Sequence, residues 1–228
     1  MTERVKYQTE TADMMIPHGL LRSFFASASA LIAAVPDGDR QRSGLAGSYV
    51  DNVLKFLDVH HGSEDELLWP VLASRCPQAA ELLARMEAQH HAVDRLRHEV
   101  ESSLGRWTAS AESQEGERLA AGLRKLDFEL ETHLGEEEQE ILPLASENVS
   151  PEEWGALPGH AMANFNGDKP WLVLGLVMEQ MNDEQRVHLI AALPPPALEM
   201  WQARGETEFT AYIADLRSGA PDGDPASN

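Results

Sequence analysis

Apolar residues recur at intervals of three and four along almost the whole chain, and no segment keeps the strict alternation of a half-buried strand. Prolines, glycines and short polar runs interrupt this pattern at 36–39, at 76–77 and at 110–116. Pro17 suits the first turn of a helix, whereas Pro70 should kink or tighten the last turn of its helix. The pattern therefore predicts four long helices, at about 17–35, 44–74, 78–104 and 117–142.

Shorter helical segments follow the four long ones. Ser150 followed by Pro-Glu-Glu is typical of a helix N-cap with acidic residues in the first turn. Residues 164–170 predict a linker, and the apolar residues from 171 to 178 predict a helix that packs onto the bundle. Further helices should lie within 183–193 and between the prolines at 194–196 and about 216. We therefore expect an all-α chain with a C-terminal helical extension over 147–217 and a disordered tail over 218–228.

The composition of this chain of 228 residues narrows the classes of function. The net charge of −20 argues against nucleic-acid and anionic-membrane partners, because both need clustered Lys and Arg. A single cysteine, Cys76, excludes a disulfide framework and a thiolate metal cluster. The N-terminus lacks the pattern of a secretory signal, and no apolar run approaches the length of a membrane span. We expect a cytoplasmic protein, and its oligomeric state is left open.

The motif His-x₃-Glu-x₅-Pro occurs twice, and its two copies are 73 residues apart. Four residues along a helix correspond to about 40° of rotation and about 6 Å of rise, so both side-chain heads can reach one inward point. Two helices that do this would build half of a metal site. The copies consist of His60, Glu64 and Pro70, and of His133, Glu137 and Pro143.

The spacing of four histidines, one on each predicted long helix, is consistent with this site. His18, His60, His90 and His133 are separated by 42, 30 and 43 residues. In an up-down-up-down four-helix bundle, a site near one end gives long, short and long intervals. A set of imidazoles and carboxylates without sulfur suits iron or manganese better than zinc. Two carboxylates on opposite helices can bridge a pair of ions, and a di-iron centre with an open position would bind and reduce O₂, NO or peroxide.

The remaining histidines are weaker candidates. His91 is rotated by about 100° from His90, and its helical neighbour Arg95 is a poor companion for a cation. We expect His61 to point toward a neighbouring helix or solvent, and His98 and His188 to lie at the surface. His160 follows the bundle and could fold over its open end to add a nitrogen ligand. A ferritin-like site is incomplete here, because only Glu87 with His90 forms the required Glu-x₂-His pair.

These motifs resemble those of hemerythrin-like proteins, the family with the His-His-Glu cation-binding domain. The resemblance covers residues 12–146 and implies a hemerythrin-like four-helix bundle there. It implies two iron ions bridged by an oxo or hydroxo group and by Glu64 and Glu137, with the histidines as terminal ligands. Oxygen carriers of the family have a second histidine four residues after the ligand of the third helix. Asp94 stands there, so the site is either one histidine short or uses Asp94 as a carboxylate ligand.

The sequence thus predicts a non-haem di-iron protein that binds O₂, NO or peroxide in a helical bundle. Turnover of peroxide or NO is left open, because the residues do not define the coordination sphere. The alternative is an iron- or oxygen-sensing module without turnover, whose extension changes its packing when the centre is occupied. A bundle with vestigial ligands is a third hypothesis. The predicted metal ligands are His18, His60, Glu64, His90, His133 and Glu137, with Asp94 and His160 as further candidates.

Overall fold

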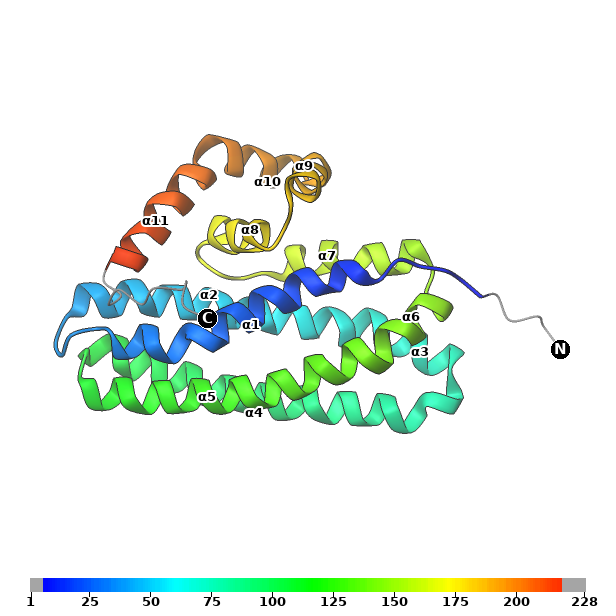
Figure 1. The fold of residues 1–228 in the computed structure, drawn as a ribbon, viewed down its shortest axis with the longest axis horizontal. Helices are drawn as coiled ribbons and strands as arrows, with labels where there is room; N and C mark the ends of the chain where they lie inside the picture. The colour runs from blue at the N-terminus through cyan, green and yellow to red at the C-terminus, as the bar shows by residue number, and fades with distance from the viewer. Residues whose placement is uncertain (1–5, 219–228) are drawn as a thin grey trace, which may run out of the picture.

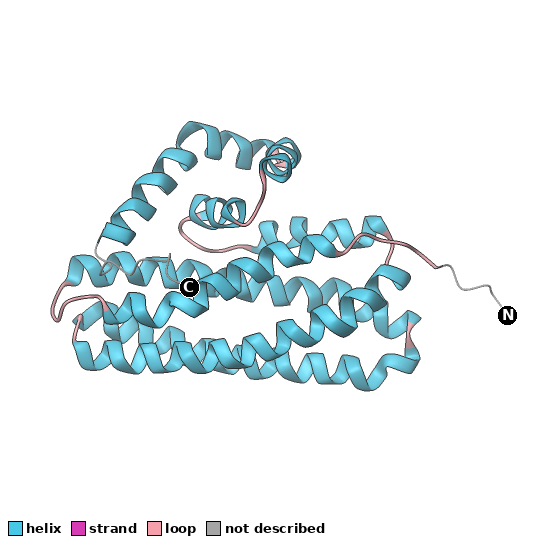
Figure 2. Cartoon of the chain, in the orientation of Figure 1, coloured by secondary structure: helices cyan, strands magenta, loops and turns pink. Residues whose placement is uncertain are grey.

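Four long helices pack side by side and form the body of the protein (Figure 1). The computed structural model describes residues 6–218, and this part of the chain contains helices and loops but no strand (Figure 2). Helix α1 packs against α2 and α5, and α4 packs against the same two helices. None of the helices within residues 6–218 has the length and apolar character that a membrane crossing requires. The four helices are α1 (Met15–Ala33), α2 (Arg40–Ser63), α4 (Ala80–Ser110) and α5 (Ser113–Glu136).

Local sequence explains most of the helix ends. The 3-10 turn η1 (Ala12–Met14) leads into α1, which begins two residues before Pro17. Gly38, with a φ of 76°, forms the turn before α2, and the Asp39 side chain caps α2 by accepting a hydrogen bond from the Arg42 N–H at 2.9 Å. Helix α4 continues beyond the predicted end at residue 104, because the buried Trp107 keeps its last turns against the core.

Both copies of the repeated motif contain a wide π turn. Helix α2 continues through η2 (Glu64–Leu68) into α3 (Trp69–Arg75), and α5 continues through η4 (Glu137–Ile141) into α6 (Leu142–Asn148). The Trp69 N–H donates to the Glu64 carbonyl, and the Leu142 N–H donates to the Glu137 carbonyl. A proline follows each turn, lacks an N–H and would clash with the carbonyl four residues before it. Pro70 was predicted to kink or tighten the last turn of its helix; the tightening is wrong, because the turn before Pro70 is widened and the helix continues to Arg75.

The apolar core is divided into two clusters along the bundle axis. The first apolar cluster contains buried residues 20–32 of α1, 46–57 of α2, 93–107 of α4 and 119–134 of α5. The second apolar cluster contains buried residues of η1, η2, α3, α4, η4, α6 and α7, and fills the other end. His18, His60, Glu64, His90 and Glu137 fall between the two stretches on their helices, and His133 lies at the end of the first stretch, next to Leu134. The fold thus surrounds a polar layer with apolar side chains on both sides.

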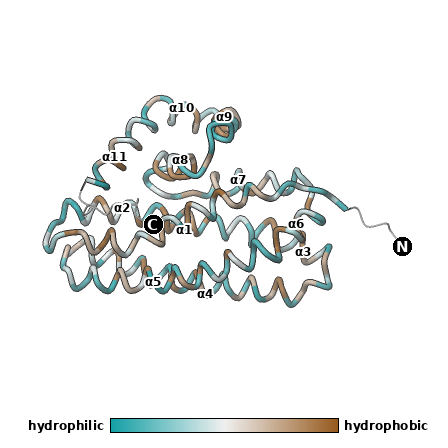
Figure 3. The backbone as a smooth tube through the Cα atoms, viewed as in Figure 1, coloured by the Kyte–Doolittle hydropathy of each residue, from teal (hydrophilic) through white to brown (hydrophobic). Residues whose placement is uncertain are grey.

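The C-terminal extension (residues 151–218) covers one side of the bundle (Figure 1). Its first helix, α7, begins with a capping box formed by Ser150 and Glu153 and packs against α2 and η2. The most apolar helix, α8, packs against α1 and α2 and joins the first apolar cluster, as its hydropathy predicts (Figure 3). Residues 219–228, where a disordered tail was predicted, lie outside the described residues. The elements are α7 (Pro151–Asn164), α8 (Pro170–Glu179), α9 (Asp183–Ala192), α10 (Pro195–Met200), the π turn η5 (Trp201–Gly205) and α11 (Glu206–Ser218). A short connector, the 3-10 turn η3 (Pro77–Ala79), joins α3 to α4.

Candidate metal centre

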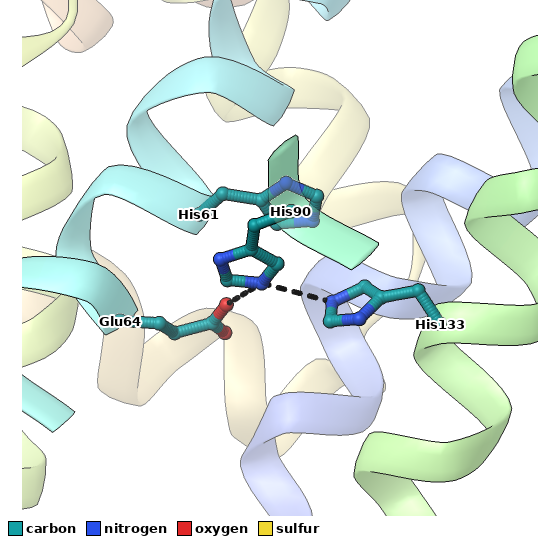
Figure 4. Close-up of side chains that lie close together, drawn as sticks. All are labelled: His61, Glu64, His90 and His133. Carbon is teal, nitrogen blue, oxygen red and sulfur yellow. Dashed lines mark hydrogen bonds and ion pairs between the residues drawn. The ribbon is translucent and has the colours of Figure 1, made fainter. Parts of the chain in front are cut away.

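Seven buried side chains from the four long helices meet in the polar layer between the two apolar clusters. They form two groups in which the candidate ligand atoms all lie within 4.8 Å of one another. Figure 4 shows the second group, with His90 beside His61 and facing both Glu64 and His133. The first group is His18, His60, Glu64 and Glu137, and the second group is His61, Glu64, His90 and His133.

In the first group, carboxylate oxygens face imidazole Nε2 atoms at distances slightly longer than a hydrogen bond. His18 Nε2 lies 3.3 Å from Glu137 Oε2, and His60 Nε2 lies 3.5 Å from Glu64 Oε1. The rings of His18 and His60 meet edge to face, with centroids 5.2 Å apart. All four side chains thus point to a common volume between α1, α2 and α5.

In the second group, His90 is central. Its Nε2 lies 3.4 Å from Glu64 Oε2 and 3.1 Å from His133 Nε2 (Figure 4). The ring of His61 stacks on the ring of His90 with a centroid distance of 4.1 Å. His133 Nε2 also lies 3.7 Å from Glu137 Oε2, so Glu137 reaches toward the second group as well.

Glu64 belongs to both groups and lies between them. Its Oε1 faces His60 of the first group, and its Oε2 faces His90 of the second group. A carboxylate that presents its two oxygens to two separate sets of ligands has the arrangement needed to bridge two cations. The wide turn that begins at Glu64 and the four-residue step from His60 set this position.

The residues present fit a bound cation. Nε2 of His18, His60 and His61 and all four carboxylate oxygens of Glu64 and Glu137 are buried and make no hydrogen bond within the described residues. Buried ionisable groups without partners are costly unless they are paired or coordinate a metal. Two carboxylates and five imidazoles, without sulfur, are nitrogen and oxygen donors typical of transition-metal sites.

The outer nitrogen of three histidines is held by a neighbouring side chain. His90 Nδ1–H donates to Asp65 at 2.7 Å, His18 Nδ1–H donates to Glu138 at 2.7 Å, and His133 Nδ1–H donates to the Gln89 amide oxygen at 3.2 Å. Each contact fixes the ring orientation and turns Nε2 toward the centre. Asp65 and Glu138 each directly follow a carboxylate of the cluster, Glu64 and Glu137. Glu138 is therefore a partner of His18 and not a member of either group.

The buried histidines differ in the direction in which their pKa values are shifted. Burial, together with neighbouring imidazoles, lowers the pKa of His60 to about 3, that of His133 to about 4, and that of His61 well below its ordinary value. These imidazoles are neutral near pH 7 and available as ligands. Burial also acts to lower the pKa of His90, but Asp65 and Glu64 outweigh it and raise that pKa to about 9.

The two central carboxylates also differ. Burial and the nearby Glu137 raise the pKa of Glu64, whereas the histidines around Glu137 lower its pKa despite burial. A proton held on His90 or shared with Glu64 has to leave when a cation binds, because ligands bind in their deprotonated forms.

His61 is the residue that sequence reasoning missed. It was expected to point away from the site, but it is buried and stacks on His90 within the second group. His60 and His61 are about 100° apart around α2, and each faces a different group because the two groups lie side by side. The adjacent histidine pair in the first copy of the motif, absent from the second copy, was the available signal.

Two further candidates lie elsewhere in the structure. Asp94 is about half exposed and accepts hydrogen bonds from Arg97 at 2.6 and 3.1 Å, so the idea that it completes the site is wrong. His160 on α7 pairs with Ser63 at 3.2 Å and with Glu66 at 3.0 Å, and it is in neither group. The other predicted ligands, His18, His60, Glu64, His90, His133 and Glu137, are brought together in the two groups.

A comparison with protein-family models matches residues 9–145, more than half of the chain, to the hemerythrin HHE cation binding domain. The chain belongs to the hemerythrin family. The matched residues run from just before η1 to the middle of α6 and include every member of both ligand groups. Comparisons with curated proteins and with solved structures gave no match, so membership in the hemerythrin family rests on the family model.

Proposed function

We propose that this chain is a non-haem di-iron protein that binds O₂, NO or peroxide inside its helical bundle. The observation that carries the proposal is the position of Glu64, whose two oxygens face two separate groups of histidines. One cation in each group would share this carboxylate. Five imidazoles and two carboxylates would leave coordination positions open for a small ligand, because two six-coordinate ions need more donors than these seven residues supply.

Each part of the site would have a distinct role. Iron would supply reversible one-electron chemistry and an open position for the small ligand. The two groups would hold the ions, with Glu64 shared between them and Glu137 within reach of both His18 and His133. Asp65 and Glu138 hold the Nδ1 protons of two histidines and so orient these rings. The two apolar clusters cover the centre from both directions along the bundle axis.

A sensing function is the second candidate, because the extension contacts the turn that contains Glu64. Helix α7 packs directly against η2, and His160 of α7 bonds to Ser63 and Glu66 on either side of Glu64. A shift of Glu64 on metal or ligand binding would therefore be passed to α7. If this module is a sensor, iron loading should change the protease sensitivity of residues 151–218; identical digestion patterns would contradict sensing.

The proposed ligand binding is tested by optical spectroscopy. Protein loaded with Fe(II) without oxygen should develop charge-transfer bands in the near-ultraviolet and visible range on exposure to O₂, NO or peroxide. Glu64→Gln should abolish these bands, whereas the control Glu66→Gln should retain them, because Glu66 is mostly exposed and lies in neither group. A wild-type protein that holds iron but shows no spectral change with any of the three ligands would contradict the proposal.

A further inference from the structure

A large cavity lies between the bundle and the extension and ends at the metal centre. Its volume is about 420 Å³, and its wall is built from η1, α1, α2, η2, α7, α8 and the segments that follow α8. His60 and Glu64 of the metal centre belong to its wall, and so does Met162, which is 41% exposed. The extension therefore forms part of the cavity wall as well as covering one side of the bundle.

The cavity wall is almost entirely apolar. Among the described residues, the wall has polar atoms only in the side chains of Asp13, His60, Ser63, Glu64 and Trp154, and none of its described residues is a Lys or Arg. The Asp13 carboxylate accepts a hydrogen bond from Trp154 Nε1 at 3.0 Å, and the Ser63 hydroxyl donates to the Val59 carbonyl at 2.7 Å. These two residues are therefore already paired. The rest of the wall consists of side chains such as Phe56, Val59, Leu157, Val173, Leu174 and Val177.

At one end of the cavity, the lining residues His60 and Glu64 carry buried polar atoms without a partner. His60 Nε2 and both oxygens of Glu64 make no hydrogen bond within residues 6–218. An occupant that matches this distribution is apolar along its length and has a single polar end beside His60 and Glu64. A negatively charged end group has no cationic side chain to pair with in this wall.

The cavity is much larger than a diatomic molecule needs. A water-sized molecule takes up about 30 Å³, whereas cavities of about 300–1,000 Å³ are typical of sites for organic ligands. We propose that this cavity binds a medium-chain aliphatic molecule with one neutral polar end, such as a fatty alcohol or aldehyde, and directs that end toward Glu64. This binding site goes beyond the proposed di-iron function, because the apolar wall exists without any metal.

The site is tested with the neutral fluorescent probe N-phenyl-1-naphthylamine, titrated into metal-free and iron-loaded full-length protein. Probe fluorescence should rise saturably in both forms, and decan-1-ol should displace the probe. Ala161→Trp projects a large ring into the cavity, whereas Ala163→Trp is the matched control on the exposed side of the same helix. Val177→Phe obstructs the cavity independently from α8.

We expect Ala161→Trp and Val177→Phe to weaken probe binding by about tenfold or more, which corresponds to about 1.4 kcal/mol, and Ala163→Trp to leave it unchanged. Absence of saturable binding to the wild type, or equal binding by Ala161→Trp and Ala163→Trp with native circular dichroism, would overturn the site. Decanoate that displaces the probe from metal-free protein as well as decan-1-ol does would overturn the neutral end group. Iron content, measured in parallel, reports separately on the di-iron proposal, so that either proposal can fail alone.

Discussion

The two copies of the repeated motif use the same backbone device. In each copy a wide π turn begins at the glutamate, and a proline follows the turn. The residue after the glutamate is an acidic residue whose carboxylate accepts a hydrogen bond from a histidine of another helix. The helical segments that follow the two copies also meet, because Arg75 of α3 donates a 2.8 Å hydrogen bond to the carbonyl of Asn148, the residue at the matching position of α6. A local sequence pattern thus positions both halves of the centre.

The copies differ at the residue after the first histidine. The first copy has His61, which enters the second ligand group, whereas the second copy has Leu134, which is fully buried in the first apolar cluster. The first copy also borders the cavity through His60 and Glu64. This one difference explains why the first copy provides three candidate ligands and the second copy provides two. Three imidazoles come from the motif copies, and His18 and His90 come from the other two helices.

His61→Ala removes the ligand by which the first copy differs from the second, and among the variants that compare the two copies it should have the largest effect on metal binding. Loss of a ligand should cost more affinity for one ion than the about 10–100-fold that is typical for loss of a partner behind a ligand. Calorimetric titration with Fe(II) under anaerobic conditions measures this change. His91→Ala is the control, because His91 is exposed and in neither group. Equal affinities of the two variants would remove His61 from the site.

Asp65→Asn and Glu138→Gln test whether the two copies orient histidines in the same way. Each substitution keeps the shape of the side chain but weakens the acceptor of the 2.7 Å hydrogen bond from His90 or His18. We expect each variant to bind Fe(II) about 10–100-fold more weakly, with similar losses for the two. The same calorimetric titration measures both. If either variant binds Fe(II) as tightly as the control Glu66→Gln, the two copies do not orient their histidines in the same way.

The smallest expected effect concerns the link between the first copy and the extension. Arg75 forms a two-point ion pair with Glu153 of α7, at 2.7 and 2.8 Å. The Arg75 pair and then the Ser150 N–H lower the pKa of Glu153 to about 2. A carboxyl whose pKa falls on folding stabilises the folded state above its ordinary pKa, and this contribution is lost as the pH falls through the folded value. An exposed pair of this kind contributes about 0–1 kcal/mol.

Glu153→Gln should therefore lower the free energy of unfolding slightly at pH 6, and its difference from the wild type should vanish as the pH falls from about 4.5 to about 2. Urea unfolding at several pH values measures the difference. Glu152→Gln, in the same helical turn, is the control. A difference between wild type and Glu153→Gln that is constant over this pH range would show that charge at Glu153 is not involved.

The residues recoverable from the sequence are those with a periodic signal. The repeat at His60 and His133, and the helical spacing of Glu64 and Glu137, predict four inward-facing side chains because helix geometry alone fixes their direction. His61 was not recoverable by that reasoning, since a single inward point per helix leaves no place for two adjacent histidines. The structure accommodates both because there are two groups.

The wide turns and the cavity depend on tertiary arrangement. A proline predicts a local disturbance, but whether the preceding turn narrows or widens depends on the packing around η2 and η4. Asp94 occupied the position of an expected ligand, yet Arg97 pairs with it at the surface. The apolar residues of α8 predicted packing against the bundle, but not that a cavity would lie beside Glu64.

Glu64 is proposed to join the two ligand groups into one centre. Anaerobic Fe(II) titration of metal-free protein, followed by removal of free iron and metal analysis, tests it most directly. We expect two ions per chain in the wild type, one for each group, and a loss from both groups in Glu64→Gln. A wild-type protein that retains one ion or none, or a Glu64→Gln variant that still retains two, would contradict it.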